Sequence, residues 1–236
     1  PQSATWASPE VLIDTEVNAD STGITMEDFD NDGDFDLIFV HSIRKTRNEI
    51  RYYENIGTQE SPNWILRTTE YLPDFDTSLS SHDLSIASAD LDGDQDYDIL
   101  LAQFGTPLIY YENRGTLSEP DFVKCGPMVS CLEHGNYSHF AFADLDNDSD
   151  LDLVICASPI TDARLHYYRN DGSPIKPRWN YVSDKFANYT IHNSPVQPLS
   201  SSPTFGDIDQ DGDLDMLVGY GWVGQDQNGG ISFYRN

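Results

Sequence analysis

A nine-residue acidic segment occurs four times in this chain of 236 residues, and it limits the possible folds more than any other feature. In each copy, aspartate stands at the first, third, fifth, seventh and ninth positions, and the copies follow one another at spacings of 62, 54 and 63 residues. A motif that recurs at such intervals predicts a repeat architecture. The copies are Asp28–Asp36, Asp90–Asp98, Asp144–Asp152 and Asp207–Asp215.

Several further elements accompany these loops. A short strand pattern precedes each loop, and an apolar run too short for a helix follows it. A pair of aromatic residues comes next, with an asparagine two residues after it. In the first three copies a proline follows, with an aromatic residue two positions after the proline. Four short strands per unit without helical periodicity predict an all-β fold, a β-propeller of four-stranded antiparallel blades. The asparagines are Asn55, Asn113, Asn170 and Asn236, and the later aromatic residues are Trp64, Phe122 and Trp179.

The chain is expected to form one propeller domain over residues 1–236. The fourth repeat ends at Asn236 without its last strand. Trp6 precedes the first acidic loop by the same 22 residues that separate Phe122 from the third loop. We therefore expect a strand within residues 1–13 to complete the fourth blade and to cover its edge. The alternatives are closure between chains and closure by further blades outside this sequence. The predicted repeat units are 14–72, 73–130, 131–188, and 189–236 together with 1–13.

In three copies the first aspartate of the loop follows Ala or Gly, and in every copy the last aspartate precedes a hydrophobic run. These loops resemble the FG-GAP/VCBS repeats, the calcium-binding blades of integrin-α-type propellers. The Phe-Gly of the family name is present at Phe205-Gly206. The resemblance covers nearly the whole chain. It implies a propeller fold, calcium in the loops and an extracellular setting. It implies no single function, because such propellers serve adhesion, recognition and scaffolding.

Calcium prefers six to eight oxygen ligands, and carboxylates at alternate positions of a tight turn can supply them. We expect side-chain ligands from the first, third, fifth and ninth positions, and a backbone carbonyl from the seventh, whose side chain then faces outward. Up to four Ca²⁺ ions follow. The predicted side-chain ligands are Asp28, Asp30, Asp32, Asp36, Asp90, Asp92, Asp94, Asp98, Asp144, Asp146, Asp148, Asp152, Asp207, Asp209, Asp211 and Asp215. The predicted carbonyl ligands are Asp34, Asp96, Asp150 and Asp213.

The sixth loop position divides the four loops into two pairs. Glycine stands there at Gly33 and Gly212, but Gln95 and Ser149 replace it in the second and third loops. A left-handed residue that is not glycine is strained, so we expect these two loops to bind calcium more weakly. A solvated acidic turn without any ion is the alternative interpretation of all four loops.

Charge and hydropathy exclude two classes of function. A net charge of −27 would repel a nucleic-acid backbone or an anionic membrane surface. The mean hydropathy is −0.50, and no apolar run approaches the roughly 18 residues of a membrane-spanning helix, so we expect no membrane insertion. A protein or glycan partner, including another copy of the chain, is the remaining expectation.

Cysteines and glycosylation motifs fit a secreted protein. Cys125 and Cys131 flank a Gly-Pro turn and are predicted to form a local disulfide, whereas Cys156 in an apolar run is expected to be a buried thiol. Asn136 and Asn188 begin N-glycosylation triplets. The first residue is not methionine, which is expected if a signal segment has been removed or if the chain is part of a longer one.

Function beyond calcium binding is only broadly indicated. No nucleophile, phosphate-loop or metal-hydrolase motif occurs, so we expect a non-catalytic module for structure or adhesive recognition. Such a module can be a subunit of an extracellular assembly. The first alternative is a calcium-dependent lectin, for which Trp222 is a better surface candidate than the repeated tryptophans, which favour blade packing. The second is the propeller of a polysaccharide-degrading enzyme.

Overall fold

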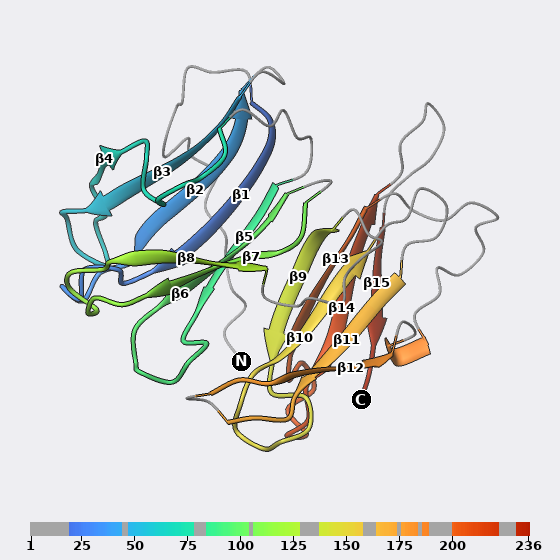
Figure 1. Cartoon of the computed structure of the whole chain (residues 1–236). Helices are drawn as coiled ribbons and strands as arrows, with labels where there is room; N and C mark the ends of the chain where they lie inside the picture. Colours follow the sequence, from blue (N-terminus) through green and yellow to red (C-terminus); the bar gives the residue numbers. More distant parts are fainter. Residues whose placement is uncertain are drawn as a thin grey trace.

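A computed structural model describes residues 19–43, 47–77, 84–103, 106–127, 137–157, 164–173, 176–183, 186–188, 200–221 and 230–236. Four antiparallel sheets follow one another along the chain and are arranged as the blades of a β-propeller (Figure 1). The predicted all-β propeller is thereby confirmed. The helical content of these residues is one 3₁₀ turn, Phe186–Asn188, and no helix among them could span a membrane.

Each blade is built from consecutive strands in sequential order. Blade 1 contains β1 (Ala19–Glu27), β2 (Asp36–Ile43), β3 (Arg47–Asn55) and β4 (Trp64–Thr68). Blade 2 contains β5 (Leu84–Ala89), β6 (Asp98–Gln103), β7 (Ile109–Asn113) and β8 (Phe122–Pro127). Blade 3 contains β9 (Tyr137–Ala143), β10 (Asp152–Ala157), β11 (Arg164–Asn170) and β12 (Trp179–Ser183). Blade 4 contains β13 (Ser200–Gly206), β14 (Asp215–Gly221) and β15 (Gly230–Tyr234).

Successive blades pack through their first strands and their sheet faces. β1 lies against β5, β5 against β9, and β9 against β13. The core is accordingly divided into three apolar clusters, one at each junction between neighbouring blades. At the first junction Ile38 of blade 1 and Ile99 of blade 2 are fully buried, and at the second Leu100 and Leu153 are. Because the second strand of a middle blade faces a neighbour on both sides, it needs the continuous apolar run seen in the sequence.

The asparagine that ends the third strand holds the turn to the fourth. The side-chain Oδ1 of Asn55 accepts hydrogen bonds from the backbone N of Gly57 at 3.0 Å and of Asn63 at 2.8 Å. A Cβ atom on Gly57 would lie 2.3 Å from the carbonyl oxygen of Ser61, so only glycine fits there. Asn113 and Asn170 repeat the arrangement in blades 2 and 3.

The expected last strand of the fourth blade stays a prediction. Residues 1–13, which were assigned to it, lie outside the described residues, and the fourth sheet is described with three strands. The four sheets lie within the four predicted repeat ranges, one sheet in each.

Candidate metal centres

The four acidic loops occupy the same place in every blade. Each connects the first strand of a sheet to the second, so all four lie at the same end of their blades (Figure 1). In each loop the structure brings together the carboxylates of the first, third and fifth positions, with one oxygen of each within 4.8 Å of the others. The groups are Asp28, Asp30 and Asp32; Asp90, Asp92 and Asp94; Asp144, Asp146 and Asp148; and Asp207, Asp209 and Asp211.

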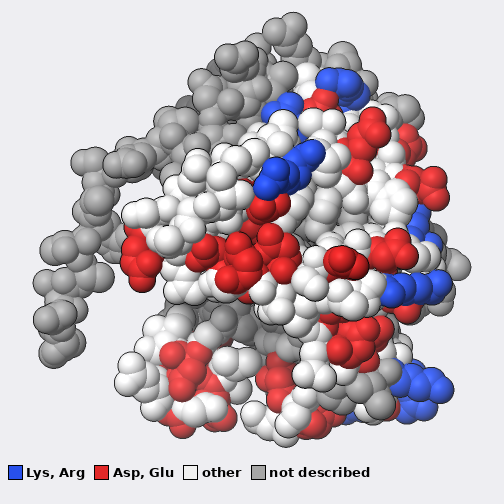
Figure 2. Space-filling model, turned by 90° about the vertical axis from the view of Figure 1, so that its left-hand side faces the viewer, with Lys and Arg blue, Asp and Glu red and all other residues white. Residues whose placement is uncertain are grey.

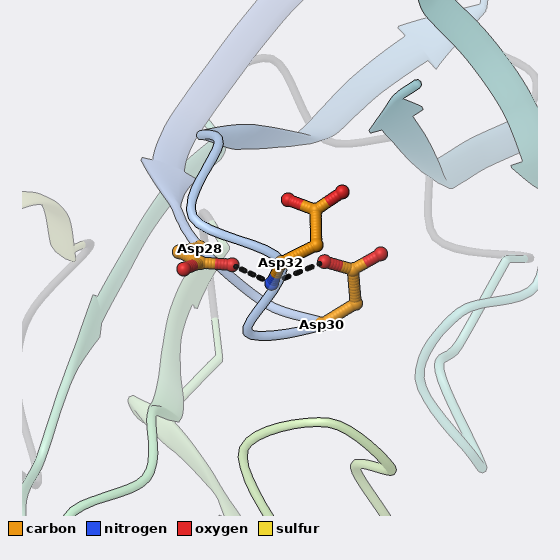
Figure 3. A group of neighbouring side chains, drawn as sticks. All are labelled: Asp28, Asp30 and Asp32. Atoms are coloured by element: carbon orange, nitrogen blue, oxygen red, sulfur yellow. Dashed lines mark hydrogen bonds between the residues drawn. The ribbon is translucent and has the colours of Figure 1, made fainter. Parts of the chain in front are cut away.

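Backbone amides of the loop orient these carboxylates. In the first loop, shown in Figure 3, the backbone N of Asp32 donates to Oδ1 of Asp28 at 3.1 Å and to Oδ1 of Asp30 at 3.2 Å. Gly33 N donates to the other oxygen of Asp28 at 3.0 Å, and Asp34 N donates to Oδ1 of Asp32 at 2.9 Å. Such side-chain to backbone bonds are the ordinary way in which aspartate shapes a turn.

The tight course of the loop requires left-handed residues at its fourth and sixth positions. The sixth position has φ of 97° at Gly33 and 99° at Gly212, where glycine is unstrained. Gln95 and Ser149 adopt the same region with φ of 77° and 75°. The prediction of left-handed residues other than glycine in the second and third loops is confirmed. Their weaker calcium binding stays a prediction.

The seventh position differs between the loops, and one expectation about it is wrong. The side chains of Asp96 and Asp150 were expected to face outward, but both are buried, and Oδ1 of each has no hydrogen-bond partner. Asp213 is exposed, as expected. Asp150 lines a cavity of about 180 Å³ with Asp90 of the preceding blade and with Trp179 of its own last strand. Blade 4, where Asp213 is exposed, has no such last strand among the described residues. Surroundings that come from another strand and another blade could not be read from one loop.

Burial and negative neighbours change the acidity of these side chains. Desolvation, reinforced by the charge of Asp94, raises the pKa of Asp96 to about 6. The pKa of Asp150 is raised to about 6 by desolvation and by Asp148. A buried carboxylate with an unpartnered oxygen beside other carboxylates is unfavourable without a cation. These two oxygens are therefore the observation that favours a metal ion in the second and third loops.

The ninth position has a structural role that the sequence did not reveal. Asp36 is fully buried, and its Oδ1 accepts a hydrogen bond from the backbone N of Asn55 at 2.8 Å. Its Oδ2 accepts from the backbone N of Phe29 at 3.2 Å and from the hydroxyl of Tyr52 at 2.9 Å. The carboxylate thus ties the start of the loop to the end of the third strand. Its role as a calcium ligand stays a prediction.

This set of hydrogen bonds recurs in the other blades. Asp98 accepts from Leu91 N, Asn113 N and the Tyr110 hydroxyl. Asp152 accepts from Leu145 N, Asn170 N and the Tyr167 hydroxyl. In blade 4 Asp215 keeps the two backbone donors, Ile208 and Asn236, but Phe233 stands where the other blades have tyrosine. The aromatic pair and the asparagine are therefore linked to the acidic loop by these bonds.

The donor set fits a hard divalent cation. Each loop offers at least three converging carboxylates, and such oxygen-only surroundings suit calcium. Acidic side chains gather in clusters over the face shown in Figure 2, while Lys and Arg lie mostly toward its top and right-hand edge. Two of the loops have an arginine close by: Arg235 Nε lies 3.0 Å from Asp209, and Arg169 Nε lies 4.0 Å from Asp146.

Four blades with an acidic loop between their first two strands define the protein as a β-propeller with repeated candidate metal sites. Comparison with protein families assigns the chain more closely. The model of the FG-GAP-like repeat matches residues 28–101, 90–155 and 144–218, so the chain belongs to that family and the resemblance is confirmed. A search of curated proteins found no match.

The remaining candidate residues are described only in part. Cys125 is exposed and has no disulfide partner among the described residues, and its Sγ donates to Oε2 of Glu112 at 3.1 Å. Cys131 and Asn136 lie outside the described residues, and the side chain of Asn188 is not described, so the disulfide and the glycosylation sites stay predictions. Cys156 is buried, as expected. Trp179 packs into the junction between blades 2 and 3, which confirms the packing interpretation for this residue.

Proposed function

We propose that this propeller is a secreted, calcium-stabilised recognition module that acts without catalysis, as a structural or adhesive unit of an extracellular assembly. The observation that carries the proposal is the repeated convergence of three aspartate carboxylates in one loop of every blade. Four such clusters concentrate negative charge that a divalent cation would neutralise. The chain carries 40 acidic residues against 13 basic ones, and the twenty loop aspartates are half of the acidic residues.

Calcium at these sites would join the first and second strands of each blade. Extracellular calcium modules bind with dissociation constants of about 10⁻⁴ to 10⁻³ M. Millimolar calcium would then stabilise the folded state by about 0.4 to 1.4 kcal/mol per site. Such affinities suit an extracellular protein, where calcium is abundant, and they would make the fold a calcium-dependent platform for a protein or glycan partner. Rigid loops at one end of the blades would be suitable for contact with that partner.

Calorimetric titration tests the proposal. The protein, first depleted of metal with a chelator, is titrated with Ca²⁺ and in parallel with Mg²⁺, and its thermal unfolding is followed with and without calcium. We expect binding at millimolar or lower calcium and a rise of several degrees in the melting temperature. Asp30→Ala should remove one site, whereas Glu60→Ala, an exposed substitution outside the loops, should remove none. Identical unfolding with calcium and with chelator would contradict the proposal.

A further inference from the structure

The two end blades expose apolar side chains at positions that the inner junctions bury. Ile231 on β15 stands five residues before Asn236, as its counterparts stand before the asparagines of the other blades. Ile231 is 74% exposed, whereas the counterparts Ile50, Leu108 and Leu165 are 0%, 1% and 0% exposed. These counterparts face the next blade along the chain. The corresponding face of blade 4, which we call the rear face, includes Ile208, Ile231 and Phe233, all exposed.

Blade 1 shows the matching feature on its other side. Ile24 stands four residues before the first acidic loop and is 59% exposed. Its counterparts Ile86 and Phe140 are 6% and 7% exposed, because each packs against the preceding blade. Met26 and Phe35 are exposed on the same blade. We call Ile24, Met26 and Phe35 the front face.

The exposed positions define the chemistry of their partner. At every inner junction the rear face of one blade packs against the front face of the next, as Ile50 of blade 1 and Ile86 of blade 2 do in one apolar cluster. The surface that fits the rear face of blade 4 is therefore a front face of the same repeat. The front face of blade 1 is such a surface, but it is itself exposed, so the two ends of this chain do not cover each other.

We propose that a second copy of this chain covers both faces, head to tail, with the rear face of each copy against the front face of the other. The contact is heterologous, because two different surfaces meet, and a pair of such contacts closes a ring of two chains. That ring would contain eight blades, within the usual range of four to eight for propellers. Each new junction repeats the packing that the chain already uses three times between its own blades.

Native mass and sedimentation of the intact protein test the arrangement. We expect a dimer, with about twice the chain mass of 26.6 kDa, that dissociates on dilution. Ile24→Arg and Ile231→Arg should each give a folded monomer, because both side chains are already exposed and thermal unfolding of the monomer should show intact blades. Ile56→Arg is the matched control: Ile56 is also exposed but lies in the turn between β3 and β4, so this variant should remain a dimer.

Mixing the two variants distinguishes a head-to-tail contact from other contacts. The Ile24→Arg chain keeps its rear face and the Ile231→Arg chain keeps its front face, so an equimolar mixture should form a heterodimer with one intact junction. A symmetric contact of front face with front face would be lost in Ile24→Arg and untouched in Ile231→Arg, which would overturn the proposal. A wild-type protein that is monomeric at all concentrations would overturn it as well, since no second copy would then cover these faces.

Discussion

The hydroxyl of Tyr52 donates a hydrogen bond to the carboxylate of Asp36 across 2.9 Å, and this contact joins the aromatic strand to the acidic loop in blade 1. The pairs Tyr110 with Asp98 and Tyr167 with Asp152 repeat it at 3.0 and 2.9 Å. A buried carboxylate needs such donors, because burial without hydrogen bonds is costly. The loop and the strand are thus parts of one polar network in each of these blades.

Removing this hydroxyl should weaken the blade. Tyr52→Phe leaves Asp36 with two backbone donors and should lower the free energy of unfolding by about 1.5 to 3 kcal/mol, the usual contribution of a hydrogen bond to a charged group. Urea unfolding measures the loss. Tyr53→Phe, one residue along the strand, is the matched control and should change stability less. The Tyr53 hydroxyl accepts a hydrogen bond from Arg51 at 3.5 Å and, among the described residues, makes none to Asp36. Equal losses in both variants would argue against the role of the Tyr52 contact.

The stability of the calcium-free protein should fall as the pH rises. Burial raises the pKa of Asp36 to about 6 and that of Asp98 to about 7, above the value near 3.8 in the unfolded chain. Between about pH 4 and pH 7 the folded state therefore binds more protons than the unfolded state. The free energy of unfolding should decrease with pH by about 1.4 kcal/mol per pH unit for each proton of difference.

Saturating calcium supplies the control for this pH dependence. Calcium requires ionised carboxylates and competes with protons, so its presence should reduce or reverse the decrease. Urea unfolding at a series of pH values, with calcium and with chelator, measures both slopes. A calcium-free protein that becomes more stable from pH 5 to pH 7 would contradict the expectation.

Glycine at the sixth loop position should stabilise the second and third loops. Gln95→Gly and Ser149→Gly should each raise the free energy of unfolding by about 1 kcal/mol, because both residues have positive φ, which costs a non-glycine residue about that much. The calcium affinity of those loops should rise in parallel. Gly33→Ala provides the reverse experiment, since its Cβ would meet no atom within 4 Å and only the backbone strain would act.

Neutralising the buried seventh-position carboxyl should act mainly in the absence of calcium. Asp96→Asn removes a buried charge beside Asp94 and should raise the free energy of unfolding of the calcium-free protein by on the order of 1 kcal/mol or more at pH 8. Asp213→Asn, at the exposed equivalent, should leave it nearly unchanged. Thermal unfolding in chelator compares the two. A larger effect at Asp213 would show that burial does not control the difference.

Trp6 should fill a pocket between blades 3 and 4. The pocket has a volume of about 380 Å³ and is lined by Phe186, Tyr234 and Asn236 among others. In blade 2 the last-strand aromatic Phe122 pairs with the equivalent asparagine and contacts Tyr71 of the preceding blade, with ring centroids 5.4 Å apart. We expect the strand within residues 1–13 to place Trp6 in the same way on blade 4. The strand comes either from the same chain or from the partner in the dimer.

Trp6→Ala should therefore lower the melting temperature by several degrees and shift the fluorescence spectrum. Trp222→Ala, a tryptophan that interrupts the repeat pattern, is the comparison and should have a smaller effect on melting. Equal melting temperatures for wild type and Trp6→Ala would contradict the placement.

The sequence by itself determined the blade. The spacing of the acidic loops, the apolar run after each loop and the aromatic residues of the third and fourth strands predicted four repeated sheets. The short strand expected before the first loop is β1 (Ala19–Glu27), and the strand expected at Trp64 is β4 (Trp64–Thr68). Such features can be predicted from the sequence because strand patterns and turn chemistry are local, and their repetition makes each local pattern easier to recognise. The convergence of the first, third and fifth aspartates follows from the same local geometry.

Only the tertiary structure decided what each loop residue faces. Asp36 is bound by Asn55 and Tyr52, which are 19 and 16 residues away, and no local pattern specifies that contact. Asp150 is buried beside Asp90 of another blade and Trp179 of another strand, whereas Ile231 is exposed on the last of the described blades. Burial depends on which surfaces meet in space. Equivalent positions of the repeats therefore differ in burial when their neighbours differ.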